Sequence, residues 1–208
     1  MATYDSETAL LVVDVQNDFA DPGGSLYVQG GEEVVPVINR EIEGALEAEA
    51  KVFYTQDWHP ESTPHFEKDG GIWPVHCVAQ TEGAALHPEL QVAGEIVRKG
   101  TGGEDGYSGF TVRDPETAEE SPTRLADLLR THGIRRLIVA GIATDYCVKE
   151  TVLDARRLGY DVSVLTEGIR AVNLEPGDAD RALAQMRSAG ASLLGSGGQG
   201  SPEEPGGW

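Results

Sequence analysis

Short apolar runs alternate with helix-periodic segments along almost the whole chain, and this alternation constrains the fold more than any other feature. Runs typical of buried strands occupy residues 9–15, 51–56, 95–98, 137–140 and 161–165, with a shorter one at 191–194. Segments with apolar residues at helical spacing occupy residues 32–50, 121–133, 147–159 and 178–189. Strands separated by helices favour a parallel sheet. We therefore predict an α/β fold with a mostly parallel sheet and helices on both of its faces.

The segment from Gly141 to Cys147 connects one of these strands to the helix that follows. In an open α/β sheet, ligands bind at the carboxyl ends of the strands, where this connection lies. Thr144 is suited to cap the helix, which would put Cys147 at the third helical position. Free backbone N–H groups and the helix dipole favour a thiolate there. Cys147 is thus a candidate nucleophile, although an isolated cysteine can equally be a small buried hydrophobic residue.

The composition of the 208 residues excludes several classes of protein. The chain is 39% hydrophobic and 25% charged, as globular proteins are. No apolar run approaches the ~20 residues of a membrane span, and the polar N-terminus is not expected to be a secretory signal. Two cysteines give no disulfide framework, which suits a cytoplasmic protein. A net charge of −19 disfavours nucleic acid and anionic membranes as partners.

We expect one domain over residues 1–194, followed by a flexible tail over residues 195–208 that is rich in Gly, Ser, Pro and Glu. Residues 111–120 are polar and predict an exposed connection, after which Ser121 and Pro122 should begin a helix as N-cap and first residue. The helix over residues 32–50 should bury one apolar face. That face consists of Val34, Val35, Ile38, Ile42, Ala45 and Leu46.

Two further charged residues lie at predicted strand ends, as Cys147 does. Asp14 ends the run over residues 9–15, and Lys99 follows the run over residues 95–98. Because the carboxyl ends of parallel strands share one edge, an acid, a cation and a thiol can meet there. Together they could supply a proton shuttle, an electrostatic stabiliser and a nucleophile. The alternative is a salt bridge between Asp14 and Lys99 with Cys147 as packing.

Four of the five histidines lie between residues 57 and 93, in a long stretch without regular structure. Loops of this length inside a domain are usually functional. Asp57 and His59 are two residues apart in an extended segment, so both side chains can reach one point. With His65 and His76 they form a candidate site for Zn, Mn or Fe, although an Asp-x-His pair can also be an ordinary surface pair. His87 and His132 are assigned structural roles.

Three aromatic residues, Phe19, Trp73 and Tyr107, lie on three different predicted loops near the same carboxyl ends of strands. Such residues can line a pocket for a flat ligand. They can equally cover the core. From the sequence alone the two interpretations stay open.

Five motifs occur in an order that resembles one family, the nicotinamidase/pyrazinamidase branch of the isochorismatase-like cysteine hydrolases. They are residues 13–19 (VDVQNDF), 57–60 (DWHP), 73–77 (WPVHC), 99–100 (KG) with 107–110 (YSGF), and 141–147 (GIATDYC). The resemblance covers residues 9 to 194. It implies a Rossmann-like three-layer α/β/α sandwich, in agreement with the alternation of strands and helices.

The resemblance also implies roles for individual residues. Cys147 matches the family nucleophile, Asp14 the general base and Lys99 the third member of the triad. The backbone N–H groups of Ala143 and Cys147 match the oxyanion hole, and the bond between Ile142 and Ala143 is expected to be cis. Residues that match metal ligands are Asp57, His59 and His76, with His65 a ligand in some members. Phe19, Trp73 and Tyr107 match positions around the substrate ring, whereas Cys77 is expected to be structural.

The implied reaction is the metal-dependent hydrolysis of nicotinamide, and of pyrazinamide, through a thioester. The expected cofactor is one divalent ion, zinc before manganese or iron. Two alternatives stay open, namely an amidase of the same superfamily that acts on a carbamoyl or ureide substrate, and a binding module of the same fold without activity. The metal motif argues against the first and the complete triad against the second. The sequence leaves the oligomeric state open, a homo-oligomer included.

Overall fold

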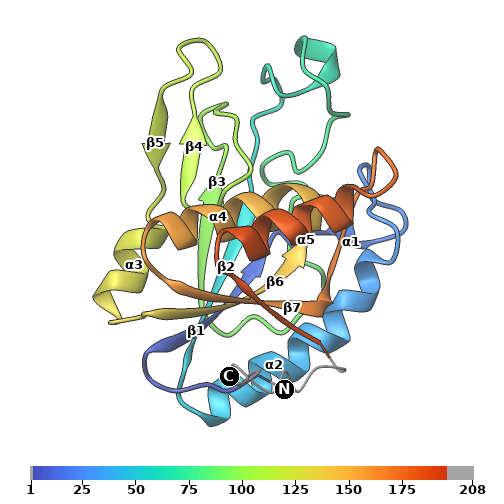
Figure 1. The fold of residues 1–208 in the computed structure, drawn as a ribbon. Helices are drawn as coiled ribbons and strands as arrows, with labels where there is room; N and C mark the ends of the chain where they lie inside the picture. The colour runs from blue at the N-terminus through green and yellow to red at the C-terminus, as the bar shows by residue number, and fades with distance from the viewer. Residues whose placement is uncertain (1, 196–208) are drawn as a thin grey trace, which may run out of the picture.

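The computed structural model describes residues 2–195, and their strands form a parallel sheet in the order β3-β2-β1-β6-β7-β8 (Figure 1). All pairs of neighbouring strands in this sheet are parallel. The strands are β1 (Thr8–Val13), β2 (Lys51–Asp57), β3 (Glu95–Lys99), β6 (Arg136–Ile142), β7 (Asp161–Arg170) and β8 (Ser192–Leu194). The predicted parallel sheet is therefore confirmed.

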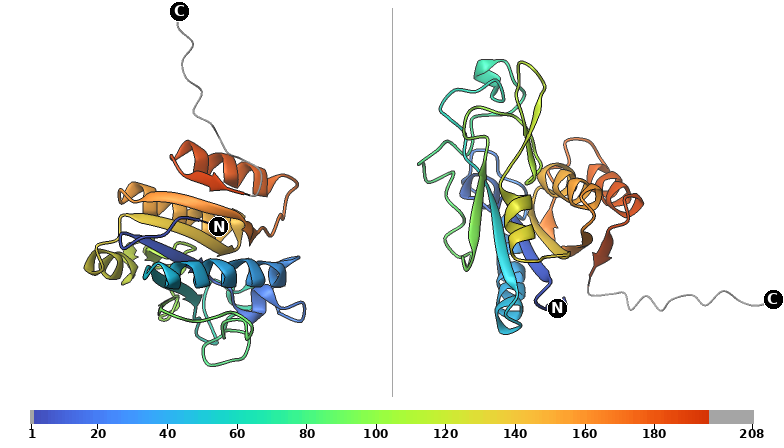
Figure 2. Two further views of the ribbon diagram at one scale, coloured as in Figure 1. Left: turned by 90° about the horizontal axis from the view of Figure 1, so that it is seen from below. Right: turned by 90° about the vertical axis from the view of Figure 1, so that its left-hand side faces the viewer.

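Helices cover both faces of the sheet, as Figure 2 shows from two further directions. Helix α2 (Val34–Glu47) lies on one face, and α3 (Leu125–Thr131), α4 (Lys149–Arg157) and α5 (Asp178–Ser188) lie on the other. Shorter helical turns are α1 (Asn17–Ala20), η1 (Gly31–Glu33), η2 (Glu67–Asp69) and η3 (Thr144–Val148). The fold is the three-layer α/β/α sandwich that the sequence predicts.

The alternation of side chains along β1 divides the core in two. Leu10 and Val12 belong to the cluster that includes Ile38 and Ile42 of α2. The intervening residues Ala9, Leu11 and Val13 belong to the cluster formed with the helices of the other face. Because successive side chains of a strand point to opposite faces, a strand that is apolar throughout is buried on both sides.

The order in which strands are added to the sheet reverses between β1 and β6. The chain builds β1, β2 and β3 outward to one edge, then returns to place β6 on the other side of β1. In doubly wound sheets, ligands bind at the carboxyl ends of the strands that flank such a point. The ends of β1 and β6 carry Asp14 and the segment 141–147, so the topology itself points to this edge.

The structure differs from the sequence-based prediction around residue 121. Ser121 and Pro122 do not begin a helix but belong to β5 (Glu120–Pro122), which pairs antiparallel with β4 (Thr111–Arg113). Proline is tolerated in such a two-stranded edge because not every N–H there needs a partner. The helix begins at Leu125, whose N–H donates to Thr123 Oγ1 at 3.2 Å. The connection predicted over residues 111–120 is exposed from residue 113 onward, as expected, but it forms part of this hairpin.

Two further predictions concern the C-terminal tail and membrane-spanning segments. The tail expected for residues 195–208 lies outside the described residues from residue 196 onward. Within residues 2–195, no helix combines the length and apolar character needed to cross a bilayer.

Helix α2 gives a test of the core. Ile38 is fully buried, whereas Leu46, which the sequence placed on the same apolar face, is 41% exposed. We predict that Ile38→Ala lowers the free energy of unfolding by about 2–5 kcal/mol, because it leaves a cavity in a packed core. Leu46→Ala should cost under about 1 kcal/mol. Urea unfolding of both variants measures the difference, and similar losses would contradict this packing of α2.

Candidate active site

Four adjacent strands end at one edge of the sheet. Three of them end in a charged residue or directly before one, and the fourth leads into the turn that carries Cys147. Lys99 is the last residue of β3 and pairs in register with Asp57, the last residue of β2. Asp14 follows β1, and Cys147 lies in η3 after β6. All four side chains are buried in the described structure. The sequence prediction that Asp14, Lys99 and Cys147 share one sheet edge is thus matched by the geometry.

Lys99 contacts all three of its neighbours at this edge. Its Nζ lies 3.0 Å from Asp14 Oδ2 and 3.8 Å from Cys147 Sγ, and it forms a second ion pair with Asp57. Asp14 Oδ1 accepts a hydrogen bond from Thr55 Oγ1 at 2.7 Å, while Oδ2 makes the ion pair without hydrogen-bond geometry. Oδ2 therefore keeps a lone pair that can accept a proton.

Burial decides the protonation state of the thiol. It raises the pKa of Cys147 well above its usual value, although the charge of Lys99 acts in the opposite direction. Burial also raises the pKa of Asp14, to about 6, again against the effect of Lys99. Burial thus favours the protonated thiol and opposes the thiolate expected from the helix terminus. Asp14 lies beside the thiol and is the group that can accept its proton.

The turn before Cys147 exposes backbone donors. The carbonyl oxygen of Ala143 accepts the N–H groups of Tyr146 at 3.1 Å and of Val148 at 3.0 Å, which forms one turn of π-helix. Ala143, which precedes this turn, donates none of the backbone hydrogen bonds that the described residues form outside their helices and strands. The peptide bond between Ile142 and Ala143 is cis, as expected. Ala143 and Cys147 both line the adjoining pocket, so their N–H groups are the candidate donors to a developing oxyanion.

The predicted cap of this helix is wrong in detail. Ala143, not Thr144, is the N-cap residue, and it makes no side-chain cap hydrogen bond. Thr144 is buried and begins the π-turn, because the wider turn moves the helix start by one residue. The neighbouring Asp145 fixes the turn instead, since its carboxylate accepts the N–H groups of Val172 at 3.0 Å and Asn173 at 2.8 Å.

Three histidines converge beside the triad. Ring nitrogens of His59, His65 and His76 lie within 4.8 Å of one another. His76 Nδ1 is 2.7 Å from the carbonyl oxygen of Pro74, and His65 Nδ1 is 2.8 Å from Asp105 Oδ1, so each keeps Nε2 free. Both ring nitrogens of His59 are buried without a partner among the described residues. Buried polar atoms are rarely left unpaired, so this cluster fits a bound cation.

Asp57 lies next to the histidines but outside their cluster. Its carboxylate pairs with Lys99 in this structure. Burial opposes ionisation of Asp57, yet the charges of Lys99, His59 and His76 lower its pKa to about 2. The backbone of Asp57 is fixed by the Gln16 side chain, which donates to its carbonyl and accepts its N–H, both at 2.8 Å. Asp57 is thus an ionised carboxylate at the boundary between the two groups.

A cavity opens onto both groups, because its lining includes His65 and His76 as well as Cys147. Its walls include the predicted aromatics Phe19, Trp73 and Tyr107, together with His65, His76, Ala143 and Cys147. Trp73 Nε1 donates to the Tyr107 hydroxyl at 3.0 Å, which fixes two of the walls. The aromatics therefore line a pocket together with the Cys147 thiol, and they are not only covers for the core.

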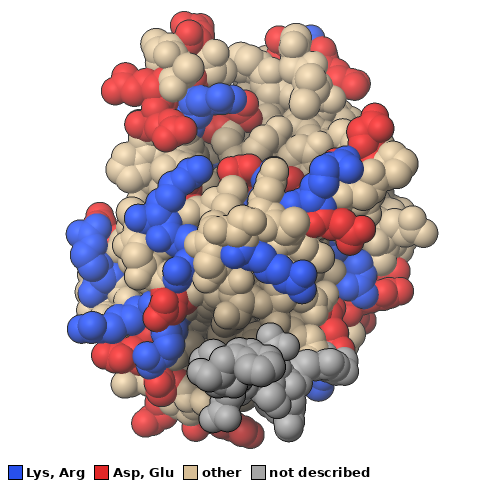
Figure 3. All heavy atoms as spheres, in the orientation of Figure 1, with Lys and Arg blue, Asp and Glu red and all other residues tan. Residues whose placement is uncertain are grey.

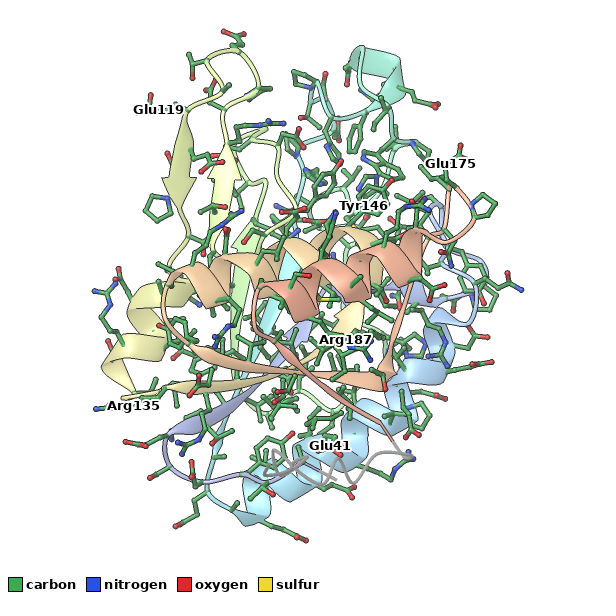
Figure 4. The ribbon with its side chains drawn as sticks, in the orientation of Figure 1. Glu41, Glu119, Arg135, Tyr146, Glu175 and Arg187 are labelled. Carbon is green, nitrogen blue, oxygen red and sulfur yellow. The ribbon has the colours of Figure 1, made fainter. Side chains whose placement is uncertain are left out.

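Tyr146 is a pocket residue that the sequence analysis missed. Its ring meets those of Trp73 and Tyr107 edge to face, with centroids 5.0 and 5.2 Å apart. Figure 4 shows it rising from η3, directly before α4, toward the loops above the sheet. Its place directly before Cys147 is the signal that could have identified it.

Of the other residues near the site, Thr55 could be found from the sequence pattern, whereas Asp105 could not. Thr55 stands two residues before Asp57 on β2, so the alternation of a strand puts both on one side. Asp105 has no sequence signal, because its partner is 40 residues away. His87 is buried and its Nδ1 accepts the Glu89 N–H at 3.3 Å, while His132 ends α3 and packs on Phe53. Neither belongs to the cluster of His59, His65 and His76.

The face of the molecule that carries α4 and α5 has no patch of a single charge. Acidic and basic side chains are interspersed there (Figure 3). The net charge of −19 therefore does not mark a single acidic patch on that face.

Comparison with known proteins supports the same conclusion as the geometry. The profile of the isochorismatase domain matches residues 8–196. The nicotinamidase of Escherichia coli (strain K12) is 42% identical over 203 residues, which cover 89% of this chain and 93% of that protein.

Two solved structures share the fold. The pyrazinamidase of Pyrococcus horikoshii, solved in complex with zinc, has a TM-score of 0.80 and 39% identity over 90% of this chain and 98% of that one. A protein of L. infantum, solved in complex with nicotinate, has a TM-score of 0.82 and 38% identity over 93% of this chain and 95% of that one. Because the domain profile spans residues 8–196 and the Escherichia coli nicotinamidase is 42% identical over most of both chains, this chain belongs to the isochorismatase family of hydrolases.

Proposed function

We propose that this protein hydrolyses nicotinamide to nicotinate and ammonia, with pyrazinamide as a second substrate. The observation that carries the proposal is the buried contact of Lys99 with Asp14 and with Cys147, whose side chain also lines an aromatic-lined cavity. A thiol, a base and a flat apolar pocket suit the attack on an aromatic carboxamide. The relatives named nicotinamidase and pyrazinamidase support the same substrate class.

Acylation begins with proton transfer from the Cys147 thiol to Asp14. The sulfur then attacks the carboxamide carbon, and the negative charge moves to the carbonyl oxygen. The N–H groups of Ala143 and Cys147 stabilise this oxyanion, and losing one such donor typically costs about 100-fold or more in rate. Asp14 returns its proton to the amide nitrogen, the C–N bond breaks, and ammonia leaves a thioester on Cys147.

Deacylation repeats these steps with water as the nucleophile. Asp14 accepts a proton from the water, whose oxygen attacks the thioester carbon. When the C–S bond breaks, the acid product departs and the proton returns to sulfur. Lys99 stabilises the ionised forms of Asp14 and Cys147 by its charge throughout.

The residues that would hold a divalent ion are Asp57, His59 and His76, with His65 as a fourth. Imidazole nitrogens with one carboxylate are a ligand set that zinc prefers, and manganese or iron can also accept it. When bound, the ion supplies a positive site that can orient the ring of the substrate. The zinc in the Pyrococcus horikoshii structure supports this choice of metal.

The direct test is the formation of nicotinate and ammonia from nicotinamide, measured with and without a chelator. Metal-dependent turnover of nicotinamide supports the proposal. Turnover of a carbamoyl or ureide substrate in place of nicotinamide would move the protein to another branch of the family. The absence of any amide hydrolysis by the metal-loaded protein would favour a binding module.

The two cysteines make a matched pair for the nucleophile. Cys147→Ala should lower turnover on the order of 10⁴-fold or more while the protein keeps its fold, because the attacking atom is removed. Cys77 is fully buried, and Cys77→Ala should cost only about 1 kcal/mol of stability and retain most of the activity. Initial rates and thermal unfolding measure both variants. Substantial activity in Cys147→Ala, or its loss in Cys77→Ala alone, would contradict the assignment.

The positions of Asp57, at the end of β2, and of His87, in the segment after it, predict which of the two is needed to retain metal. Chelator-free protein should contain about one equivalent of metal by elemental analysis. Asp57→Ala should lower that content, whereas His87→Ala should not, because His87 lies outside the cluster. Equal loss in the two variants would show that the loop does not bind metal through these residues.

Gly100 provides an indirect test of His59. A Cβ at Gly100 would lie 2.7 Å from Cε1 and Nδ1 of His59, and the backbone there has φ +72°. Gly133 has a similar φ of +69°, and no atom of the described residues lies within 4 Å of an added Cβ. Gly100→Ala and Gly133→Ala should therefore share a backbone cost of about 1–2 kcal/mol. Only Gly100→Ala should displace the imidazole and weaken metal affinity, by about 10-fold or more in a competition titration. Matching affinities in the two variants would exclude His59 as a ligand.

A further inference from the structure

Asp105 holds one histidine of the candidate metal cluster from outside the cavity. Its Oδ1 lies 2.8 Å from His65 Nδ1, and the side chains of Asp105 and His65 are 24% and 7% exposed. We propose that Asp105 is a positioning residue, which fixes the orientation and tautomer of His65 so that its Nε2 completes the metal site. This inference rests on the metal site of the proposed function but not on the substrate.

The tautomer follows from the contact. An ionised carboxylate only accepts hydrogen bonds, so His65 Nδ1 must carry the hydrogen and Nε2 must carry the lone pair. Nitrogen atoms of His59 and His76 lie within 4.8 Å of a His65 nitrogen, and His65 Nδ1 is occupied by Asp105, so Nε2 is the nitrogen left for a metal ion. A carboxylate on the second ring nitrogen also increases the basicity of a metal-bound imidazole.

The three histidines differ in this respect. His76 Nδ1 contacts a neutral carbonyl oxygen, that of Pro74, and neither ring nitrogen of His59 has a hydrogen-bond partner among the described residues. Among these three ligand candidates, His65 is the one with a carboxylate behind it. Asp105 therefore adds a negative charge behind this one ligand candidate.

Asp105 is itself held on three sides. The Gly106 N–H donates to Oδ1 at 2.8 Å, and Arg113 Nη2 donates to Oδ2 at 3.2 Å. The backbones of Asp105 and Arg113 exchange two hydrogen bonds, of 2.7 and 2.6 Å. Arg113 ends β4, so the hairpin of β4 and β5 supports the carboxylate that supports His65. This gives the hairpin, which the sequence analysis did not predict, a structural task at the site.

Two other contacts join the same segments, so a simple role in loop attachment must be separated from positioning. Thr63 Oγ1 donates to the Gly103 carbonyl at 3.0 Å, and Trp73 Nε1 donates to the Tyr107 hydroxyl at 3.0 Å. They flank the contact between His65 and Asp105 on both sides. Because they remain when Asp105 is replaced, the loops should stay attached, and the loss should fall on His65.

The experiment titrates Zn²⁺ into metal-stripped protein in competition with a chromophoric chelator, without substrate. Asp105→Ala should weaken zinc affinity by about 10- to 100-fold. Asp105→Asn keeps an acceptor oxygen for the Nδ1–H and should lie between Asp105→Ala and wild type. Arg113→Ala removes only the outer partner of the carboxylate and should change the affinity less than about 3-fold. Thermal unfolding of the metal-free proteins checks that each variant is folded.

A double-mutant cycle distinguishes positioning from attachment. If Asp105 acts through His65, then Asp105→Ala combined with His65→Ala should bind zinc no more weakly than His65→Ala alone. Wild-type affinity in Asp105→Ala, additive losses in the double variant, or no effect of His65→Ala would each overturn the proposal. Zinc binding with the expected coupling, but without nicotinamide hydrolysis, would leave this inference standing and reject the proposed function. Metal-dependent nicotinamide hydrolysis without the coupling would do the reverse.

Discussion

The ammonium group of Lys99, buried between the carboxylates of Asp14 and Asp57, holds the two halves of the site together. The side chains of Lys99, Asp14 and Asp57 are 1%, 0% and 7% exposed. An unpaired ion at such a depth would cost several kcal/mol, so none of the three groups is stable there without the others. The two carboxylates raise the pKa of Lys99 well above its usual value, although burial alone would lower it. Lys99 therefore stays charged and serves both the thiol and the candidate metal site.

The order of strands in the sheet explains how one lysine can serve both. Across β3, β2, β1 and β6, the strand ends present Lys99, Asp57, Asp14 and then the turn of Cys147. Spatial neighbours are thus far apart in sequence but adjacent in register. Asp14 adopts a φ of 49° directly after β1, a left-handed conformation that turns the chain out of the strand at that point. The carboxylate, the lysine and the thiol can then meet at one edge.

How far the sequence predicts the fold and the site depends on how local each signal is. Apolar runs mark the strand ends, so the sequence alone is enough to assign Asp14, Lys99 and Cys147 to one edge of a parallel sheet. The hairpin over residues 111–122 escapes such a prediction, since its strands of three residues are too short for a periodic pattern. The contact of Asp105 with His65 joins residues 40 apart and leaves no local trace. The capping preference of Thr144 is misleading because it assumes an α-helical turn, whereas the chain forms a π-turn there.

The long segment after β2 is irregular, yet the residues that follow Asp14 hold it in place. Gln16 binds the backbone of Asp57 and the Ala84 carbonyl, and Asn17 forms backbone and side-chain hydrogen bonds with residues 82–85. The Asp18 carboxylate accepts the Cys77 N–H at 2.7 Å, directly after the candidate ligand His76. The turn that positions Asp14 therefore also positions the histidine segment. A shift in that turn would move Asp14 and the candidate metal ligands together, which keeps the candidate base and the histidine cluster in one fixed relation.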